Sequence, residues 1–194
     1  MKVRNWIRTV PTLVIIGAVL FMVLTVGGGL LMYGHNFANH IVSSQLSEQK
    51  ITFPAQGSPA LDPKEFPGLQ RYAGLAVDNG PKAKAYADQF IKKHLEGVAS
   101  GQTYSQVSAA AQKDPTNTQL QAQANTLFKG ETLRGLLLNA WGWATVGAIA
   151  YWVAMAAFLG ALAVLGALIL GFAMHERGIH KAVTRITDSP VAVG

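Results

Sequence analysis

The sequence contains no cysteine among its 194 residues. Disulfide bonds, thiol catalysis and cysteine-ligated zinc sites are therefore excluded. Charged residues are also scarce, at 13% of the chain, against about 25% in average soluble domains. Half of the residues are hydrophobic. This combination is typical of a membrane protein.

The longest stretch without charge is Gly135–Met174, which contains no Asp, Glu, Lys, Arg or His. It spans about 40 residues, whereas a helix crosses the hydrocarbon core of a bilayer with about 20. Charge begins again at His175. Counting back about 22 residues reaches Tyr151–Trp152, whose amphipathic rings favour the headgroup level. We therefore predict a transmembrane helix over 151–174 and an apolar helix over 134–150 that projects beyond the bilayer.

The same stretch could be read as a hairpin of two membrane spans. A hairpin needs a turn, and the stretch contains no Pro, Asp or charged residue that would form one. A hairpin would also move the basic tail to the other side of the membrane. We reject this arrangement.

The predicted projection carries apolar side chains that need cover. Exposed in water, they would form a patch of the kind that marks an interaction surface. Either the protein's own outer domain covers them, or a partner does so in whole or in part. The side chains are Leu136, Leu137, Leu138, Trp141, Trp143, Val146 and Ile149.

A second apolar run, Leu13–Tyr33, follows a basic start in residues 1–10. No A-x-A-like cleavage site follows it, so we predict an uncleaved signal-anchor helix over 11–33. Basic residues also flank the other predicted span, in the tail 175–194. Under the positive-inside rule both termini are cytoplasmic, the protein lies in the plasma (inner) membrane, and the central part lies outside.

The central segment 34–133 is predicted to form a small helical outer domain. Four prolines make Ile51–Gly68 an irregular loop, either a linker or a docking segment. Apolar residues at helical spacing follow in Gly80–Val98, and Thr103 with Gln106 forms a capping-box pattern. A further helical stripe precedes the long run: Leu120, Ala124, Leu127 and Phe128. The predicted fold class is an all-α membrane protein with two transmembrane helices and about four outer helices.

The chain contains no recognisable catalytic or nucleotide-binding motif. Two pairs of histidines are five residues apart rather than four, which places the members of each pair on different helix faces: His35 with His40, and His175 with His180. His94 lies on the apolar edge of its helix, where packing or hydrogen bonding is the expected role. Neither span contains an ionisable residue of the kind that transporters use. We predict no enzymatic activity, no cofactor or metal, no nucleic acid and no small-molecule substrate.

Small residues recur every four positions in the second predicted span, at Ala163, Ala167 and Gly171. Such spacing lets helices approach closely. The row packs either against the first span or against another protein. The predicted partner contacts are therefore Trp141, Trp143, Leu137, Ala163, Ala167 and Gly171.

The segment Leu127–Trp143, LFKGETLRGLLLNAWGW, with Gly101–Tyr104, GQTY, upstream of it, resembles a group of small actinobacterial two-span membrane proteins. The resemblance implies an accessory subunit of the actinobacterial cytochrome bcc–aa3 respiratory supercomplex and carries no residue-level role. We expect a non-catalytic accessory or assembly subunit that contacts membrane lipid and other integral membrane subunits. The alternative is a membrane-anchored sensor that signals through a separate partner, because a tail of about 20 residues is too short for a signalling domain.

Overall fold

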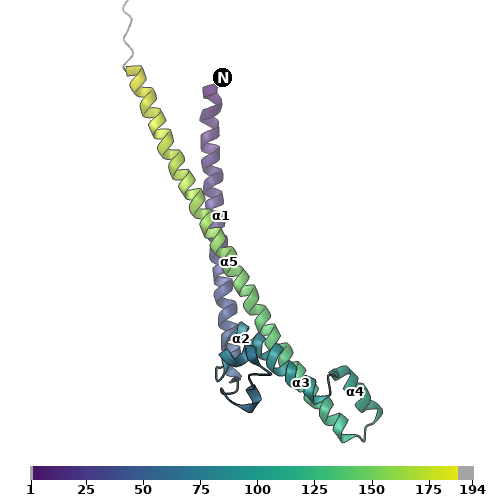
Figure 1. Cartoon of the computed structure of the whole chain (residues 1–194). Coiled ribbons are helices and arrows are strands. Elements are labelled where there is room, and N and C mark those ends of the chain that lie inside the picture. Colours follow the sequence, from purple (N-terminus) through teal and green to yellow (C-terminus); the bar gives the residue numbers. More distant parts are fainter. Residues whose placement is uncertain (1, 188–194) are drawn as a thin grey trace, which may run out of the picture. The chain divides into compact units, whose positions relative to one another are not determined.

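The computed structural model describes the backbone of residues 2–187 and the side chains of residues 12–177. Within this part the protein is helical and has no β-strand beyond an isolated bridge between Thr52 and Ala76, which confirms the all-helical prediction. The elements are α1 (Lys2–Glu48), η1 (Pro59–Leu61), η2 (Pro67–Tyr72), α2 (Gly80–Ala85), η3 (Tyr86–Ile91), α3 (Lys92–Val98), α4 (Tyr104–Lys113) and α5 (Thr118–Thr187) (Figure 1). The basic side chains of residues 1–10 and of the tail beyond Arg177, on which the predicted orientation depends, lie outside the described residues.

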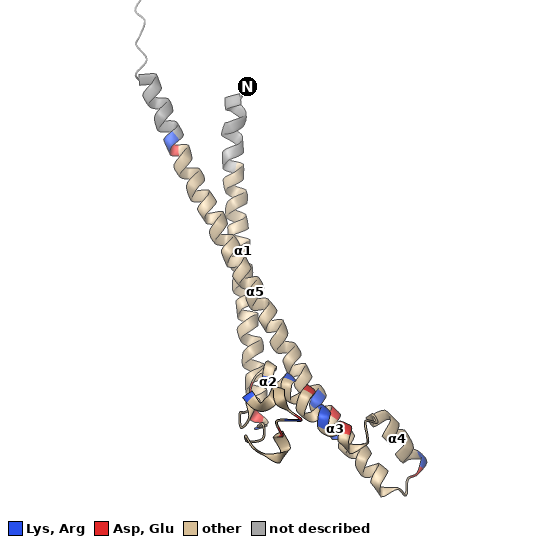
Figure 2. Cartoon of the chain, in the orientation of Figure 1, with Lys and Arg blue, Asp and Glu red and all other residues tan. Residues whose placement is uncertain are grey.

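The chain divides into two compact units. The first unit consists of Met1–Tyr33 with Ala150–Gly194, and the second of Gly34–Ile149. The described side chains of the first unit carry charge only at Glu176 and Arg177, whereas charged residues are frequent in the second (Figure 2). Two helical stretches are long and apolar enough to cross a membrane, Thr12–Glu48 and Thr118–Arg177.

In the first unit α1 and α5 pack antiparallel through glycines. A Cβ atom at Gly17 would lie 2.7 Å from Leu168, and one at Gly28 would lie 2.9 Å from the Phe158 ring. The glycines therefore permit a separation that larger residues would prevent. On α5 the side chains buried on this face include Ala154 and Ala161.

This close approach predicts that Gly28→Leu separates α1 from α5 in the first unit. The added side chain overpacks the contact with Phe158, at a cost of about 1–3 kcal/mol. Since the protein has no cysteine, cysteines introduced at Leu24 and Gly160, which are in contact, form one defined pair for disulfide cross-linking. We expect Gly28→Leu to reduce the cross-linked fraction by about fivefold or more. Gly29→Leu is the matched control, because no atom lies within 4 Å of its Cβ position; equal losses in both variants would contradict the packing.

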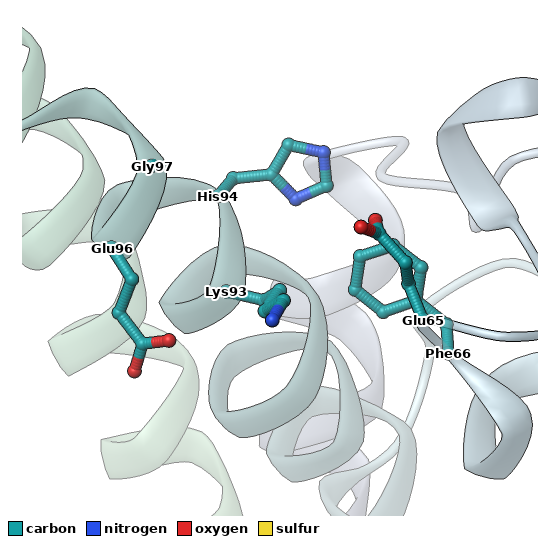
Figure 3. A pocket seen from close by; sticks show the side chains of 6 residues that line it. All are labelled: Glu65, Phe66, Lys93, His94, Glu96 and Gly97. Carbon is teal, nitrogen blue, oxygen red and sulfur yellow. The ribbon is translucent and has the colours of Figure 1, made fainter. Parts of the chain in front are cut away.

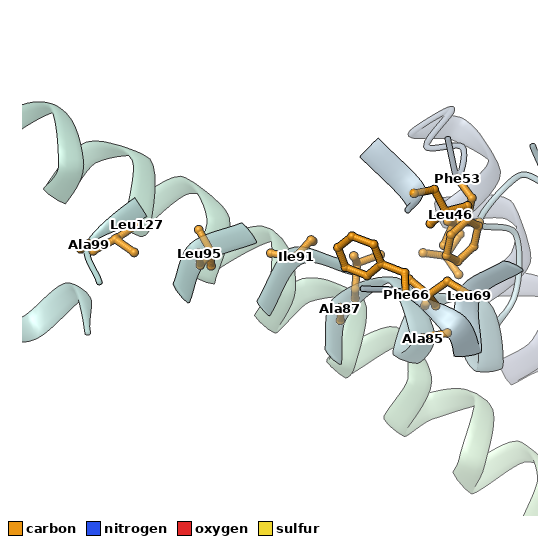
Figure 4. Packing of buried hydrophobic residues seen from close by; sticks show 14 of the residues in the cluster. Leu46, Phe53, Phe66, Leu69, Ala85, Ala87, Ile91, Leu95, Ala99 and Leu127 are labelled. Atoms are coloured by element: carbon orange, nitrogen blue, oxygen red, sulfur yellow. The ribbon is translucent and has the colours of Figure 1, made fainter. Parts of the chain in front are cut away.

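The core of the second unit includes the proline-rich segment after α1. Phe53 is only 2% exposed, stacks on Tyr72 with ring centroids 5.2 Å apart, and meets the edge of Tyr86 at 5.1 Å. Leu61 and Phe66 from the same segment are buried as well. Figure 4 shows Phe53, Phe66 and Leu69 close to Leu46 of α1. The segment predicted to be an irregular loop is irregular, and it is packed into the core.

The helix predicted over Gly80–Val98 is present as α2, η3 and α3, with a π-helical turn at η3. Five buried side chains recur every four positions, Ala83, Ala87, Ile91, Leu95 and Ala99 (which directly follows α3), and Ala85 is buried as well. In a regular α-helix a four-residue repeat drifts around the axis by about 40° at each step. A π turn has wider hydrogen-bonded loops and is less tightly wound, so it offsets this drift. The π turn thus keeps the repeat on one face.

That face packs antiparallel on α5 within the second unit. Gly80 lies against Ala144, Leu95 lies against Gly130, and the Gln123 side chain donates a hydrogen bond of 3.0 Å to the Val98 carbonyl. The contacting residues of α5 alternate at three- and four-residue spacing: Leu127, Gly130, Arg134, Leu137, Trp141 and Ala144. This spacing defines the inner face of α5.

The predicted capping box before α4 is confirmed, since Thr103 and Gln106 exchange both hydrogen bonds. The apolar stripe predicted before Gly135 is wrong at one residue, Phe128, which does not lie on the buried face. Phe128 is exposed and contacts Tyr104 at 5.5 Å between ring centroids, whereas Ala124 and Leu127 are buried. The reason is that the inner face follows Leu127 to Gly130, which turns Phe128 outward.

Candidate partner-docking surface

The apolar side chains predicted to project from the bilayer fall into two groups. Leu137 is 2% exposed in the core of the second unit, and Leu138 packs against that core. By contrast, four side chains are largely exposed: Leu136 (63%), Trp143 (58%), Val146 (55%) and Ile149 (59%). These four are named the exposed stripe of α5. The second unit itself therefore covers Leu137 and Leu138 on one face of the helix. The exposed stripe on the other face is left open for a partner.

Trp141 and Leu137, two of the predicted partner contacts, belong to the covered face. The Lys84 ammonium lies 4.2 Å from the centre of the Trp141 ring, a cation–π contact between α2 and α5. Leu137 is enclosed by the core. Both side chains are engaged within the chain, and of the two tryptophans only Trp143 presents most of its surface.

An ion-pair cluster holds the covered face in place. Asp88, in the π turn, accepts a bond of 2.8 Å from the Lys84 ammonium and one of 3.2 Å from Nη2 of Arg134 on α5. Nη1 of the same guanidinium lies 3.3 Å from Glu131. The hydrogen bond from Lys84, with a further one from Arg134, lowers the pKa of Asp88 below its usual range. The cluster contributes to fixing the rotation of α5 and therefore the direction in which the exposed stripe points.

Asp88→Asn is expected to weaken the second unit most at neutral pH. The pKa of Asp88 is lower in the folded protein than in the unfolded chain, so its contribution is present above the unfolded pKa of about 3.9 and is lost as the pH falls through the folded pKa. Because the ion pairs are partly solvated, we expect Asp88→Asn to lower the free energy of unfolding by about 0.5–1.5 kcal/mol at pH 7. Thermal melting in detergent at pH 7 and pH 3 checks this: the difference between the two proteins should shrink on acidification. A difference that grows at pH 3 would contradict the assignment.

The part of α1 in the second unit meets α5 through polar groups. The His35 ring donates from Nδ1 to the Gly147 carbonyl at 2.9 Å, and the Asn39 amide lies 3.1 Å from the same ring nitrogen. A Cβ atom at Gly147 would lie 3.2 Å from Ala38. His35 thus joins α1 to α5 within the second unit, because Gly147 brings the α5 backbone within its reach.

The small residues Ala163, Ala167 and Gly171 of the first unit are all exposed. The contact with α1 uses another face of α5, with Ala154, Phe158 and Leu168. The row therefore lies outside the face of α5 that packs on α1 in the first unit, and it is open to lipid or another helix.

A shallow, open depression of about 470 Å³ lies beside α3. It is lined by Glu65, Phe66, Lys93, His94, Glu96 and Gly97 (Figure 3). His94 donates from Nδ1 to the Phe90 carbonyl at 2.8 Å, and its ring stacks on Phe66 with an interplanar angle of 8°. His94 is thus hydrogen-bonded and packed, as expected. Across the described residues, no group of three or more His, Asp or Glu is placed to hold a metal ion.

No protein-family signature, curated protein or solved structure matches the chain. Function is therefore inferred from the surfaces that the two units expose. The exposed stripe of α5 gathers four of the exposed large apolar side chains of the second unit on one helix, and it is the candidate site.

Proposed function

We propose that the protein is a non-catalytic accessory or assembly subunit of a larger membrane protein complex and that the exposed stripe of α5 binds a partner. The observation that carries the proposal is the exposure of four large apolar side chains on a helix whose opposite face is fixed by a core and an ion-pair cluster. Large exposed apolar patches on protein surfaces mark interaction sites.

The proposed spans are 11–33 and 151–174, with the second unit outside the membrane and both termini in the cytoplasm. Polar residues of α1 support this boundary, since His35 and Asn39 lie beside Gly147 and would be costly within hydrocarbon. Trp143 precedes Tyr151 by eight residues, or about 12 Å of helix. The headgroup layer on one side is about 5–8 Å deep. Trp143 and Leu136 therefore lie beyond the headgroup layer, where only protein can cover them.

Within the bilayer, the row Ala163, Ala167 and Gly171 offers a second contact. Small residues at this spacing allow another transmembrane helix to approach closely, where van der Waals contacts drive association. We propose that an integral membrane subunit packs here. The resemblance to actinobacterial two-span proteins makes a respiratory supercomplex the first complex to test.

Affinity purification of the tagged protein in mild detergent tests the proposal. We expect large membrane proteins to co-purify in stoichiometric amounts, and Trp143→Ser to lose them while its melting temperature stays unchanged. The matched control is Leu75→Ser, which changes an exposed apolar side chain of the same unit away from the stripe. A particle that contains a single copy of this chain and nothing else, or a Trp143→Ser variant that keeps every partner, would refute the proposal.

The depression beside α3 favours a second candidate function, a membrane-anchored sensor. Its lining combines two carboxylates, an ammonium and an imidazole over the Phe66 ring, which suits a small zwitterion. A panel of free amino acids at millimolar concentration should then raise the melting temperature of the wild type and not that of Glu65→Ala. Absence of any shift would remove this candidate.

A further inference from the structure

We propose that the partner on the exposed stripe of α5 is a second copy of this chain, packed parallel to the first, with Asn139 of one copy hydrogen-bonded to Asn139 of the other. This inference rests on the proposed function, since it names the occupant of the same surface. It concerns the second unit only.

The open face of α5 has the spacing of a two-helix seam. Thr132, Asn139 and Val146 recur every seven residues, and Gly135, Gly142 and Ile149 form a second series offset by three. Apolar or small residues at alternating three- and four-residue spacing form the contact line of two helices wound around each other. All six residues are outside the core, five of them exposed and Gly142 half-buried.

The two glycines of the seam leave room for a neighbouring helix. A Cβ atom at Gly135 or at Gly142 would have no atom within 4 Å. Each glycine is followed by a large side chain, Leu136 after the first and Trp143 after the second. A helix that approaches over the glycines is therefore flanked by these side chains, which bury most of their exposed apolar surface on contact.

Asn139 indicates that the helix bound at this seam is a second copy of the chain. A carboxamide carries both donors and an acceptor, so two copies of Asn139 satisfy each other across a parallel seam without any other polar residue. A different helix would have to supply a matching polar group at the same height. A single Asn at this seam position is a known determinant of register in parallel helix dimers.

Membrane anchoring supplies the geometry for this pairing. Two copies held in one bilayer have the same orientation and the same depth, so identical positions of α5 lie at equal height. The six seam residues carry no charge, and identical faces therefore do not repel each other.

Disulfide cross-linking in native membranes tests the inference, because a single introduced cysteine is the only thiol of the chain. We expect Asn139→Cys and Gly142→Cys to form a disulfide-linked dimer about tenfold more than Ala148→Cys, which is exposed but lies on the opposite side of the helix. Gly142→Leu should abolish the dimer seen by sedimentation in detergent while the melting temperature is unchanged, because the new side chain has no neighbour within the chain.

Three outcomes would overturn the inference. These are equal cross-linking at positions 139 and 148, cross-linking of position 139 to a different protein, or a dimer that survives Gly142→Leu. If partners still co-purify and are lost on Trp143→Ser while no self-dimer forms, the proposed function stands and the second copy is refuted. If neither partners nor dimers are found, both are refuted.

Discussion

Phe53→Ala is expected to lower the free energy of unfolding of the second unit by about 3–5 kcal/mol. The Phe53 ring is almost completely buried and packs on Tyr72 and Tyr86, so it joins the segment after α1 to the helix that begins at Gly80. Its removal leaves a cavity that the surrounding rings cannot fill without leaving their own contacts.

Chemical denaturation in detergent, followed by tryptophan fluorescence, measures the effect. Phe128→Ala is the matched control, because it removes the same side chain from a site that is 53% exposed. We expect this control to change stability by about 0.5 kcal/mol or less. Comparable losses in both variants would show that the core of the second unit does not depend on Phe53.

Gly80→Leu is expected to have the second largest effect, about 3 kcal/mol of destabilisation. A Cβ atom at Gly80 would clash with the Cβ of Ala144 and would lie 3.5 Å from the Cα of Trp141. Neither neighbour can rotate away, so α2 must move off α5. Pro81 adds to the cost, since a residue with a side chain before proline disfavours the helical conformation that Gly80 adopts at the start of α2.

Thermal melting checks this expectation, with Gly97→Leu as the matched control because its Cβ position has no neighbour within 4 Å. The loss of the Lys84–Trp141 contact should accompany the Gly80→Leu change and appear as altered tryptophan emission. A Gly80→Leu protein as stable as the Gly97→Leu protein would contradict the antiparallel packing of α2 on α5.

Local patterns were sufficient to predict the helices and one of their caps. The apolar spacing of Gly80–Val98 and the pairing of Thr103 with Gln106 both have a short-range physical cause, and both are present. The π turn within the first of these helices was not predicted. A four-residue repeat such as Ala83 to Ala99 could have indicated it, because a regular α-helix cannot keep that repeat on one face.

The candidate site was predicted only in part, since its exposure depends on contacts that are distant in sequence. Leu136 and Leu137 are adjacent and chemically identical, yet only Leu137 is buried, because Leu95 and Asp88 contact Gly130 and Arg134 on that side of α5. The pair Asp88–Arg134 joins residues 46 positions apart, and no local pattern indicates it. For the same reason Ala163, Ala167 and Gly171 could not be distinguished in advance from the face that packs on α1.

The depth of Trp143 tests most directly the central claim that an apolar face of α5 stands outside the hydrocarbon and needs a protein to cover it. A nitroxide attached to a cysteine at position 143 can be compared, in lipid nanodiscs, with one at Leu159, which is equally apolar and exposed in the first unit. Collisions with oxygen, which concentrates in hydrocarbon, and with a water-soluble nickel complex give the depth of each label. We predict low oxygen collision at position 143 and high oxygen collision at position 159. Equal and high oxygen collision at both positions would place Trp143 among the acyl chains and contradict the account.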